Sequence, residues 1–395
     1  MPETFVETQI KEIKNIIGNE KAVIAVSGGV DSSTCAVLTH LAIGDNLLCV
    51  ILDDAFMREG EPERVSKILS QPPLNLPIRI EQVQERFLEA LKGLKDAEEK
   101  RKAFRETFYR TLSNIAKREG SQFIVQGTIL ADILETKGGI KTQHNVLEQI
   151  GISTRELYGF RVIEPLVSLL KWQVREVARY LKIPPEISER QPFPGPGLSV
   201  RVVGKIKIDK LNSLKRATTI TEEKLAKHKP SQYFAAIIDN KESRKYTIIE
   251  KIRVNVAKSL NIDPKEVSVK IFNDKATGIK DNARRYGDII ALSCREKGRL
   301  CHPPLGDLIA LQKNIVDAYS SVTRVWQLIS EGNKQQPYAI CIRAVKTEDF
   351  LSAHVADIPW STLEEASELI LKECPNVSSV YYDVTPKPPA TIEME

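Results

Sequence analysis

Short apolar runs alternate with longer amphipathic segments through the first half of the sequence. The run at 21–26, KAVIAV, stops at a glycine pair, and 46–54, NLLCVILDD, ends in two aspartates. Between them, 31–44 carries apolar residues at helical spacing and ends at a glycine. Runs near 76–83 and at 122–127 repeat the arrangement. Strands alternating with helices predict βαβ units, hence an α/β fold with a doubly wound parallel sheet.

A proline- and glycine-rich segment interrupts this alternation. Residues 191–198, QPFPGPGL, hold three prolines and two glycines, which disfavours both helix and strand. We therefore expect a first domain over 1–190, a joint over 191–204 and an α+β domain over 205–395. In the last of these the pattern predicts helices at 209–228, 305–320 and 361–373, and strands near 232–238, 267–272, 287–293, 337–345 and 377–383.

Composition narrows the class of protein without naming it. The chain has 42% hydrophobic and 28% charged residues and no apolar run of membrane-spanning length, so we expect a soluble protein. Six scattered cysteines form no CxxC pair, which favours buried thiols and a cytoplasmic location. A net charge of +5 suits phosphate-bearing small substrates, and no motif for a nucleic acid partner is present.

The loop SGGVDSS, residues 27–33, is the strongest chemical signal in the sequence. It lies between the first strand and the first helix, where glycines let the backbone approach a ligand and a helix N-terminus offers free N–H groups. The spacing fits neither GxxxxGK[ST] nor GxGxxG. The alternative is a serine–glycine turn that only caps a helix. The loop resembles that of the ATP pyrophosphatase (PP-loop) enzymes, which grip a leaving pyrophosphate. The expected ATP-binding residues are Ser27, Gly28, Gly29, Val30, Asp31, Ser32, Ser33 and Asp53.

Two aspartates of this set have particular expected roles. Asp31 is the candidate Mg²⁺ contact or orients the loop, and the alternative is that it caps the helix. Asp53 ends the second strand on its carboxyl side, where open α/β sheets bind ligands, so it is placed near the adenosine. Backbone amides together with Mg²⁺ can stabilise the charge that develops in nucleotidyl transfer.

Four later segments resemble GMP synthetases more specifically. They are VQGTILADILET (125–136), KTQHNV (141–146), QPFPGPGLSVRV (191–202) and KPPATIEME (387–395). The stretch 87–102 is also similar to the family. The resemblance implies a C–N ligase that adenylates XMP with Mg·ATP and aminates it with ammonia to GMP. It further implies a homodimer. Since only about 20 residues precede Lys21, too few for a glutaminase domain, a separate glutaminase subunit is expected.

The resemblance also assigns residues. A lid over the substrates would contain Lys141, His144 and Asn145, with Asp132 and Glu135 nearby. The expected XMP-binding residues are Arg201, Gln232, Asn282, Arg284, Gln327, Lys387, Ile392 and Glu393.

This sequence departs from the family pattern at several positions. Gln143 stands where the family has a histidine, and Asn282 stands where it has an aspartate, with Asp281 one residue early. Charged stretches near 240–272 and 296–336 are interpreted as insertions, so that Gln232 and Gln327 both remain candidates for XMP. DIIALSC and YAICIRAV likewise compete for one family strand.

Two other functions remain open from the sequence alone. One is another PP-loop enzyme with a changed substrate, such as a tRNA-thiolating protein, which would predict a cysteine pair and a basic RNA-binding face. The other is a paralogue that binds nucleotide without turnover.

Overall fold

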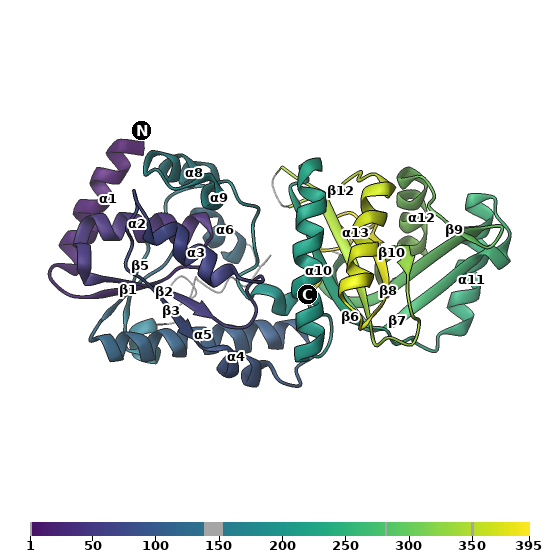
Figure 1. Ribbon diagram of the computed structural model, residues 1–395, viewed down its shortest axis with the longest axis horizontal. Helices are drawn as coiled ribbons and strands as arrows, with labels where there is room; N and C mark the ends of the chain where they lie inside the picture. Colours follow the sequence, from purple (N-terminus) through teal and green to yellow (C-terminus); the bar gives the residue numbers. More distant parts are fainter. Residues whose placement is uncertain (1, 138–152, 281–282, 349–350) are drawn as a thin grey trace. The chain divides into compact units, whose positions relative to one another are not determined.

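The computed structural model describes residues 2–137, 153–280, 283–348 and 351–395. The chain separates into two compact units (Figure 1). The first unit contains Met1–Leu91 and Arg101–Gly195, and the second contains Lys92–Lys100 and Pro196–Glu395. The chain passes from the first unit to the second for the last time between Gly195 and Pro196, within the proline- and glycine-rich segment. No helix in the described part of the chain is long and apolar enough to cross a membrane.

The first unit is built on a parallel sheet of five strands. Its order is β3-β2-β1-β4-β5, so the chain adds two strands on one side of β1 and then two on the other. The expected parallel sheet is confirmed. The strands are β1 (Ala22–Ala25), β2 (Leu47–Asp53), β3 (Ile78–Gln82), β4 (Phe123–Val125) and β5 (Arg161–Ile163).

Helices cover both faces of this sheet (Figure 1). Alternate residues of β1 face opposite sides, so Ile24 packs with α1, α2, α3 and α8, whereas Val23 packs with α5. Apolar residues on both faces of a strand are what a doubly covered parallel sheet requires. The helices are α1 (Pro2–Ile17), α2 (Val30–Ile43), α3 (Glu61–Ser70), α4 (Gln84–Leu91), α5 (Ala97–Glu119), α6 (Leu130–Lys137), α7 (Thr154–Tyr158), α8 (Lys171–Tyr180) and α9 (Pro185–Ser188), with the 3₁₀ turn η1 (Gly44–Asn46).

The second unit contains a mixed sheet of eight strands. The path β12-β11-β13-β10-β8-β7 is joined by β6 on β11 and by β9 on β8. Its strands are β6 (Gln232–Asp239), β7 (Val267–Lys280), β8 (Ala283–Glu296), β9 (Arg299–Cys301), β10 (Val322–Glu331), β11 (Tyr338–Lys346), β12 (His354–Val355) and β13 (Val377–Asp383). Its helices are α10 (Ile208–Leu225), α11 (Tyr246–Leu260), α12 (Leu305–Ala318) and α13 (Trp360–Glu373), with the 3₁₀ turns η3 (Gly197–Val200), η4 (Ala226–His228) and η5 (Pro264–Glu266).

Four elements of this unit were not predicted from the sequence pattern: helix α11, strand β10 and the short strands β9 and β12. Helix α11 and strand β10 both lie in stretches interpreted as insertions, yet β10 occupies the middle of the sheet between β8 and β13. Strands β8 and β11, which the sequence placed as alternatives for one family strand, are both present. Each begins a crossover, because α12 connects β8 to parallel β10 and α13 connects β11 to parallel β13.

Candidate active site

The loop from Ser27 to Ser33 follows β1, next to the point where the strand order reverses. Strand β4, which lies beside β1, is followed by the QGT segment, so both loops leave the same edge of the sheet at the switch point. This is where open α/β sheets bind their ligands. The Ser27 and Ser32 hydroxyls lie 3.2 Å apart, and the Ser27 N–H donates to Ser32 Oγ at 3.2 Å.

Two glycines bring backbone close to neighbouring groups at this site. Gly28 has φ +75°, and a Cβ there would lie 2.5 Å from Cγ2 of Val65. Gly127 belongs to the QGT segment, and a Cβ there would lie 2.9 Å from the backbone N of Ser32. These short distances leave no room for a side chain at Gly28 or Gly127. Main-chain atoms of the two loops therefore line the site at these positions.

Asp31 lies in the first turn of α2 and does not cap it. Gly29 is the N-cap, and the carboxylate of Asp31 instead accepts a hydrogen bond from Lys171 Nζ at 2.6 Å. Burial raises the pKa of the Asp31 carboxyl above its ordinary value; Lys171 opposes this shift and Asp132 adds to it. The second oxygen of Asp31, Oδ1, is buried without a hydrogen-bond partner in the described structure, as is Ser33 Oγ. The alternative that Asp31 caps α2 is therefore wrong. The loop also holds polar atoms that have no hydrogen-bond partner in the described chain.

Lys171 is a residue that the sequence reasoning missed. It begins α8, where the helix dipole disfavours a positive charge. That placement was a signal available in the sequence, because a lysine at a helix N-terminus is stabilised when an anion lies beside it. The loop itself contains no lysine, and α8 supplies one from 140 positions further along the chain.

Asp53, the last residue of β2, and Asp54, which follows it, are both buried and hydrogen bonded. Asp53 Oδ2 accepts from Gln84 Nε2 at 2.7 Å, and Asp54 Oδ1 accepts from the Phe56 N–H at 2.8 Å. Asp53 thus lies at the carboxyl end of its strand as expected, but its oxygen is occupied by a side chain of α4.

The proposed lid residues Lys141, His144 and Asn145, together with Gln143, lie outside the described residues. Asp132 is in the first turn of α6, and its Oδ2 accepts from the Ile129 N–H at 3.0 Å. Glu135 lies on the same helix, further along.

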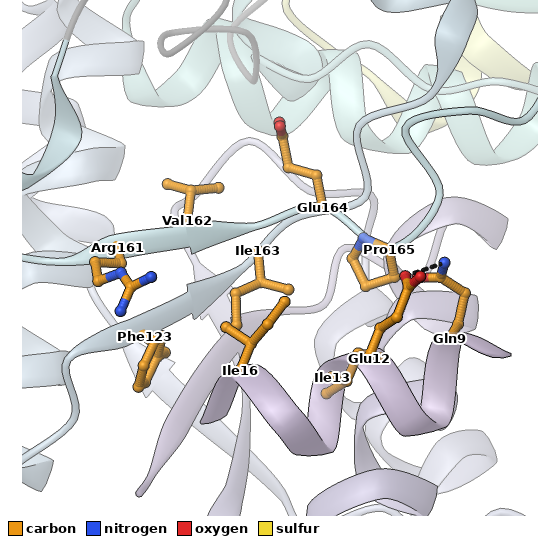
Figure 2. A pocket seen from close by; sticks show the side chains of 10 residues that line it. All are labelled: Gln9, Glu12, Ile13, Ile16, Phe123, Arg161, Val162, Ile163, Glu164 and Pro165. Carbon is orange, nitrogen blue, oxygen red and sulfur yellow. Dashed lines mark hydrogen bonds between the residues drawn. The ribbon is translucent and has the colours of Figure 1, made fainter. Parts of the chain in front are cut away.

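A pocket of ≈ 270 Å³ lies elsewhere in the first unit, between α1 and β5 (Figure 2). Gln9 and Glu12 of α1 line it on one side and Arg161 of β5 lies on the other, while Glu164 points away from it. The Glu164 carboxylate accepts from Thr128 Oγ1 at 2.6 Å. None of the residues expected to bind ATP lines this pocket.

In the second unit, Glu393 lies at the centre of a polar cluster. Arg201 donates to both carboxylate oxygens, Nε to Oε2 and Nη2 to Oε1, each at 2.9 Å. Gln232 Nε2 donates to Oε1 at 3.2 Å, and the Arg201 guanidinium stacks 4.0 Å from the ring of Phe234. Three predicted XMP residues are thus brought together from the joint, from β6 and from the last segment of the sequence.

Two buried arginines hold the backbone of that last segment. Arg343 donates from Nε to the Ile392 carbonyl at 2.8 Å and from Nη2 to the Thr391 carbonyl at 2.9 Å. Arg324 Nη2 donates to the Thr391 carbonyl at 3.0 Å and to the Glu393 carbonyl. Asp383 Oδ2 accepts a hydrogen bond from Arg324 Nη1 at 2.7 Å and forms an ion pair with Arg343, whose Nη1 lies 2.9 Å away.

None of these three side chains is exposed to solvent, and burial lowers the pKa of Arg324 to about 10. The sequence contains a signal from which the burial of Arg324, Arg343 and Asp383 could have been predicted. Each is a charged residue in the middle or at the end of an apolar strand run, as in VTRVWQLI, YAICIRAV and VYYD. Such charges are buried only when paired.

The remaining predicted XMP residues are more dispersed. Arg284 donates to Glu98 at 2.6 Å, and Asn282 lies outside the described residues. Gln327 is buried within β10 and donates to the Leu328 carbonyl at 3.3 Å. The Lys387 N–H donates to the Ala353 carbonyl at 2.8 Å, and the Ile392 side chain packs on the core with Met394.

Comparison with known sequences matches both units. A family described as NAD synthase matches residues 3–200, and one described as GMP synthase C terminal domain matches residues 307–394. The chain is 43% identical over 396 residues to a named subunit of glutamine-hydrolyzing GMP synthase from Saccharolobus solfataricus, covering 100% of this chain and 99% of that protein. The subunit of the same name from Methanopyrus kandleri is 38% identical over 401 residues, with the same coverage. Among solved structures, NMN synthetase from Francisella tularensis aligns with a TM-score of 0.40 and 19% identity, covering 50% of this chain and 78% of that one.

Proposed function

Because the chain belongs to this family of GMP synthase subunits, we propose that it activates XMP with ATP and aminates it with ammonia to give GMP. In the first step, the O2 oxygen of XMP attacks the α-phosphorus of ATP and the bond to pyrophosphate breaks. In the second, ammonia attacks C2 of the adenylated purine, and the former O2 leaves with AMP. Adenylation is needed because an amide-like oxygen is itself a poor leaving group.

The supporting observation is that one chain carries both a loop with unsatisfied polar atoms and a Glu393–Arg201–Gln232 cluster. Identity that extends over the whole chain favours this function over that of a PP-loop enzyme with another substrate.

The first unit would hold the phosphates of ATP. Backbone N–H groups of the loop and of the first turn of α2 are available to bind an anion at the N-terminus of that helix. Ser27 and Ser32 add hydroxyls, and Lys171 supplies the positive charge that the loop lacks. Because pyrophosphate gains charge as it leaves, fixed donors at this position stabilise the transition state more than bound ATP.

The loop also fits a Mg²⁺ ion that accompanies ATP. Asp31 Oδ1 is buried without a partner in the described structure, and the carboxylate of Asp132 is close enough to raise the pKa of Asp31. The described residues contain no cluster of three metal-ligating side chains. Mg²⁺ nevertheless needs only one or two carboxylates when phosphates supply the other ligands. Asp31, with Asp132, would hold the ion, which neutralises phosphate charge when it is bound.

The second unit would recognise XMP. Arg201 fixes the Glu393 carboxylate by donating one hydrogen bond to each of its oxygens. The remaining lone pairs of these oxygens would accept from the N–H groups of a purine ring or from ribose hydroxyls. Of the two candidate glutamines, we assign this role to Gln232, because it contacts Glu393 whereas Gln327 bonds within its own strand. Lys387 and Arg284 are proposed for the phosphate, with Ile392 packed beneath the base. Asn282 remains a proposed XMP-binding residue. Lys141, His144, Asn145 and Glu135 remain proposed parts of a lid.

Ammonia would come from a separate subunit. The relatives are named as one subunit of a glutamine-hydrolyzing enzyme, and we propose that a glutaminase subunit binds this chain and delivers ammonia to the adenylated purine. We further propose that the second unit mediates a homodimer.

The purified chain is therefore expected to form AMP and GMP in equal amounts from Mg·ATP, XMP and ammonium salt. Glutamine in place of ammonium should give no GMP. Nucleotides would be separated by chromatography, and omission of XMP is the control for unrelated ATP hydrolysis. ATP binding without XMP-dependent AMP or GMP would contradict the proposed function.

A further inference from the structure

Glu395, the last residue of the sequence, buries its side chain in the second unit. Lys100 Nζ donates to Glu395 Oε2 and, at 2.7 Å, to the Val202 carbonyl. The Gly204 N–H donates to Glu395 Oε1 at 2.9 Å. Lys100 is 0% exposed and Glu395 1%. A lysine and a glutamate are almost never this deeply buried unless they are paired, so the contact fixes both.

The same contact lies two residues from the Glu393 carboxylate. The backbone between them is held on both sides, since the Thr277 N–H donates to the Met394 carbonyl at 2.9 Å and the Glu395 N–H donates to the Val200 carbonyl at 3.1 Å. Val202, which contacts Lys100, directly follows Arg201 in the chain, and Gly204, which contacts Glu395, lies two residues further on. Lys100 thus ties together the two chain segments that supply the Arg201–Glu393 pair.

We propose that Lys100 is a positioning residue for the XMP site, acting through Glu395 on Glu393 and through Val202 on Arg201. The proposal rests on the proposed function, because it names a residue that sets the geometry of that XMP site. Lys100 touches no reacting atom. It lies in the first turn of α5, in the part of that helix that belongs to the second unit, 295 positions from Glu395.

Lys100→Met is expected to raise the KM for XMP at least about tenfold, because it leaves the Glu395 carboxylate buried without its counter-charge. The KM for ATP and kcat should change by less than about threefold. Lys102→Met is the matched control, since Lys102 is exposed two residues further along α5, and it should behave as the parent protein. Calorimetric titration with XMP measures the affinity of the parent protein and of both variants for XMP without relying on turnover.

Two further variants keep the test valid if Lys100→Met unfolds. Glu395→Gln retains the size of the side chain, and Lys100→Met/Glu395→Gln removes both charges. If the two residues act as a pair, the double variant should bind XMP better than the product of the single effects predicts. Unchanged XMP affinity in folded Lys100→Met, or additive effects, would overturn the proposal. Parent protein that binds XMP but makes no GMP would instead contradict the proposed function.

A pH profile separates positioning from a general loss of stability. Burial raises the pKa of the Glu395 carboxyl to about 7, against the opposing effect of Lys100. Lys210 of α10 and Tyr286 of β8 are the other charged or titratable groups that act on it. As the pH falls from about 8 to about 6, Glu395 gains a proton and the parent protein comes to resemble Glu395→Gln. The ratio of their KM values for XMP should therefore fall toward one, and a ratio independent of pH would contradict this role.

A second, independent inference concerns Cys294 of β8 and Cys301 of β9. The two residues are register partners across an antiparallel pair, and the turn between them has positive φ at Lys297 (50°) and Gly298 (78°). Such a two-residue turn fixes the register. Directly opposed residues have Cα separations of about 4.5 or 5.5 Å, both within the range that disulfides adopt. Both cysteines are free thiols, Cys294 buried and Cys301 half-buried.

The geometry points to this pair as a site of reversible disulfide formation. A low-molecular-weight disulfide would be reduced to two thiols while Cys294 and Cys301 each lose a proton and their sulfurs become bonded. Cys301 is the more accessible thiol and would react first. Burial raises the pKa of both thiols, that of Cys294 to about 12. The exchange should therefore be slow at neutral pH and faster at about pH 9.

Incubation with oxidised glutathione at about pH 9 is expected to lower the number of free thiols in the subsequently unfolded protein from six to four. Peptide mass spectrometry should then show a Cys294–Cys301 cross-link. Cys301→Ser is the matched variant and should form no such cross-link, whereas Cys374→Ser should still form it. Six free thiols in the treated parent protein, or a cross-link between other cysteines, would overturn the inference.

Discussion

Replacing Lys171 by methionine is expected to lower kcat for XMP-dependent AMP formation by about 10²- to 10³-fold, the range found when one preorganised donor to a developing charge is removed. Lys171 Nζ lies 2.6 Å from Asp31 Oδ2, beside a loop that contains no lysine of its own. Methionine keeps most of the length of the side chain and removes the ammonium group. The rate of AMP formation from XMP, ATP and saturating ammonium measures the effect.

Two companion variants decide what the lysine does. Lys171→Arg keeps the positive charge and should recover part of the rate, because a guanidinium also binds phosphate. Lys182→Met is the control, since Lys182 is exposed just beyond the end of α8, and it should leave the rate unchanged. A folded Lys171→Met protein with a rate within a few-fold of the parent would show that the lysine only neutralises Asp31.

Asp383→Asn should lower the free energy of unfolding of the second unit by about 3–5 kcal/mol, the usual cost of breaking a buried ion pair. Asp383 accepts a hydrogen bond from Arg324 and forms an ion pair with Arg343, and none of the three side chains is exposed. Asparagine removes the charge and places an amide donor against two other donors. Because the same arginines hold the carbonyls of Thr391 and Ile392, XMP affinity should fall as well.

Urea unfolding followed by tryptophan fluorescence measures this cost. The sequence contains three tryptophans, Trp172 in the first unit and Trp326 and Trp360 in the second. In a Trp172→Phe background, fluorescence therefore reports the second unit alone, which avoids treating two units as one transition. Asp317→Asn, at an exposed position of α12, is the control for removal of an aspartate charge. A change below about 0.5 kcal/mol, the size of a surface effect, would contradict the pairing.

The first unit was predictable from sequence because its signals are local. Strand β1 is recognisable as a short β-branched apolar run since both faces of a parallel sheet are covered, and α2 begins directly after the glycines that follow it. In the second unit β10 was missed. Its Arg324 and Gln327 break the apolar pattern, and Arg324 lies in the core because Asp383 and the last segment of the chain satisfy its donors.

The sequence by itself determined the parallel sheet, the loop at its switch point and the family. Each of these depends on a hydrophobic periodicity or a contiguous motif, and such signals lie within a short stretch of sequence. Tertiary structure alone decided the partners: Lys171 for Asp31, Arg201 and Gln232 for Glu393, and Lys100 for Glu395. These pairs are separated by 140 to 295 positions. A single sequence does not record which distant charges meet, since that depends on how the strands are ordered and on which groups burial forces to find a counter-charge.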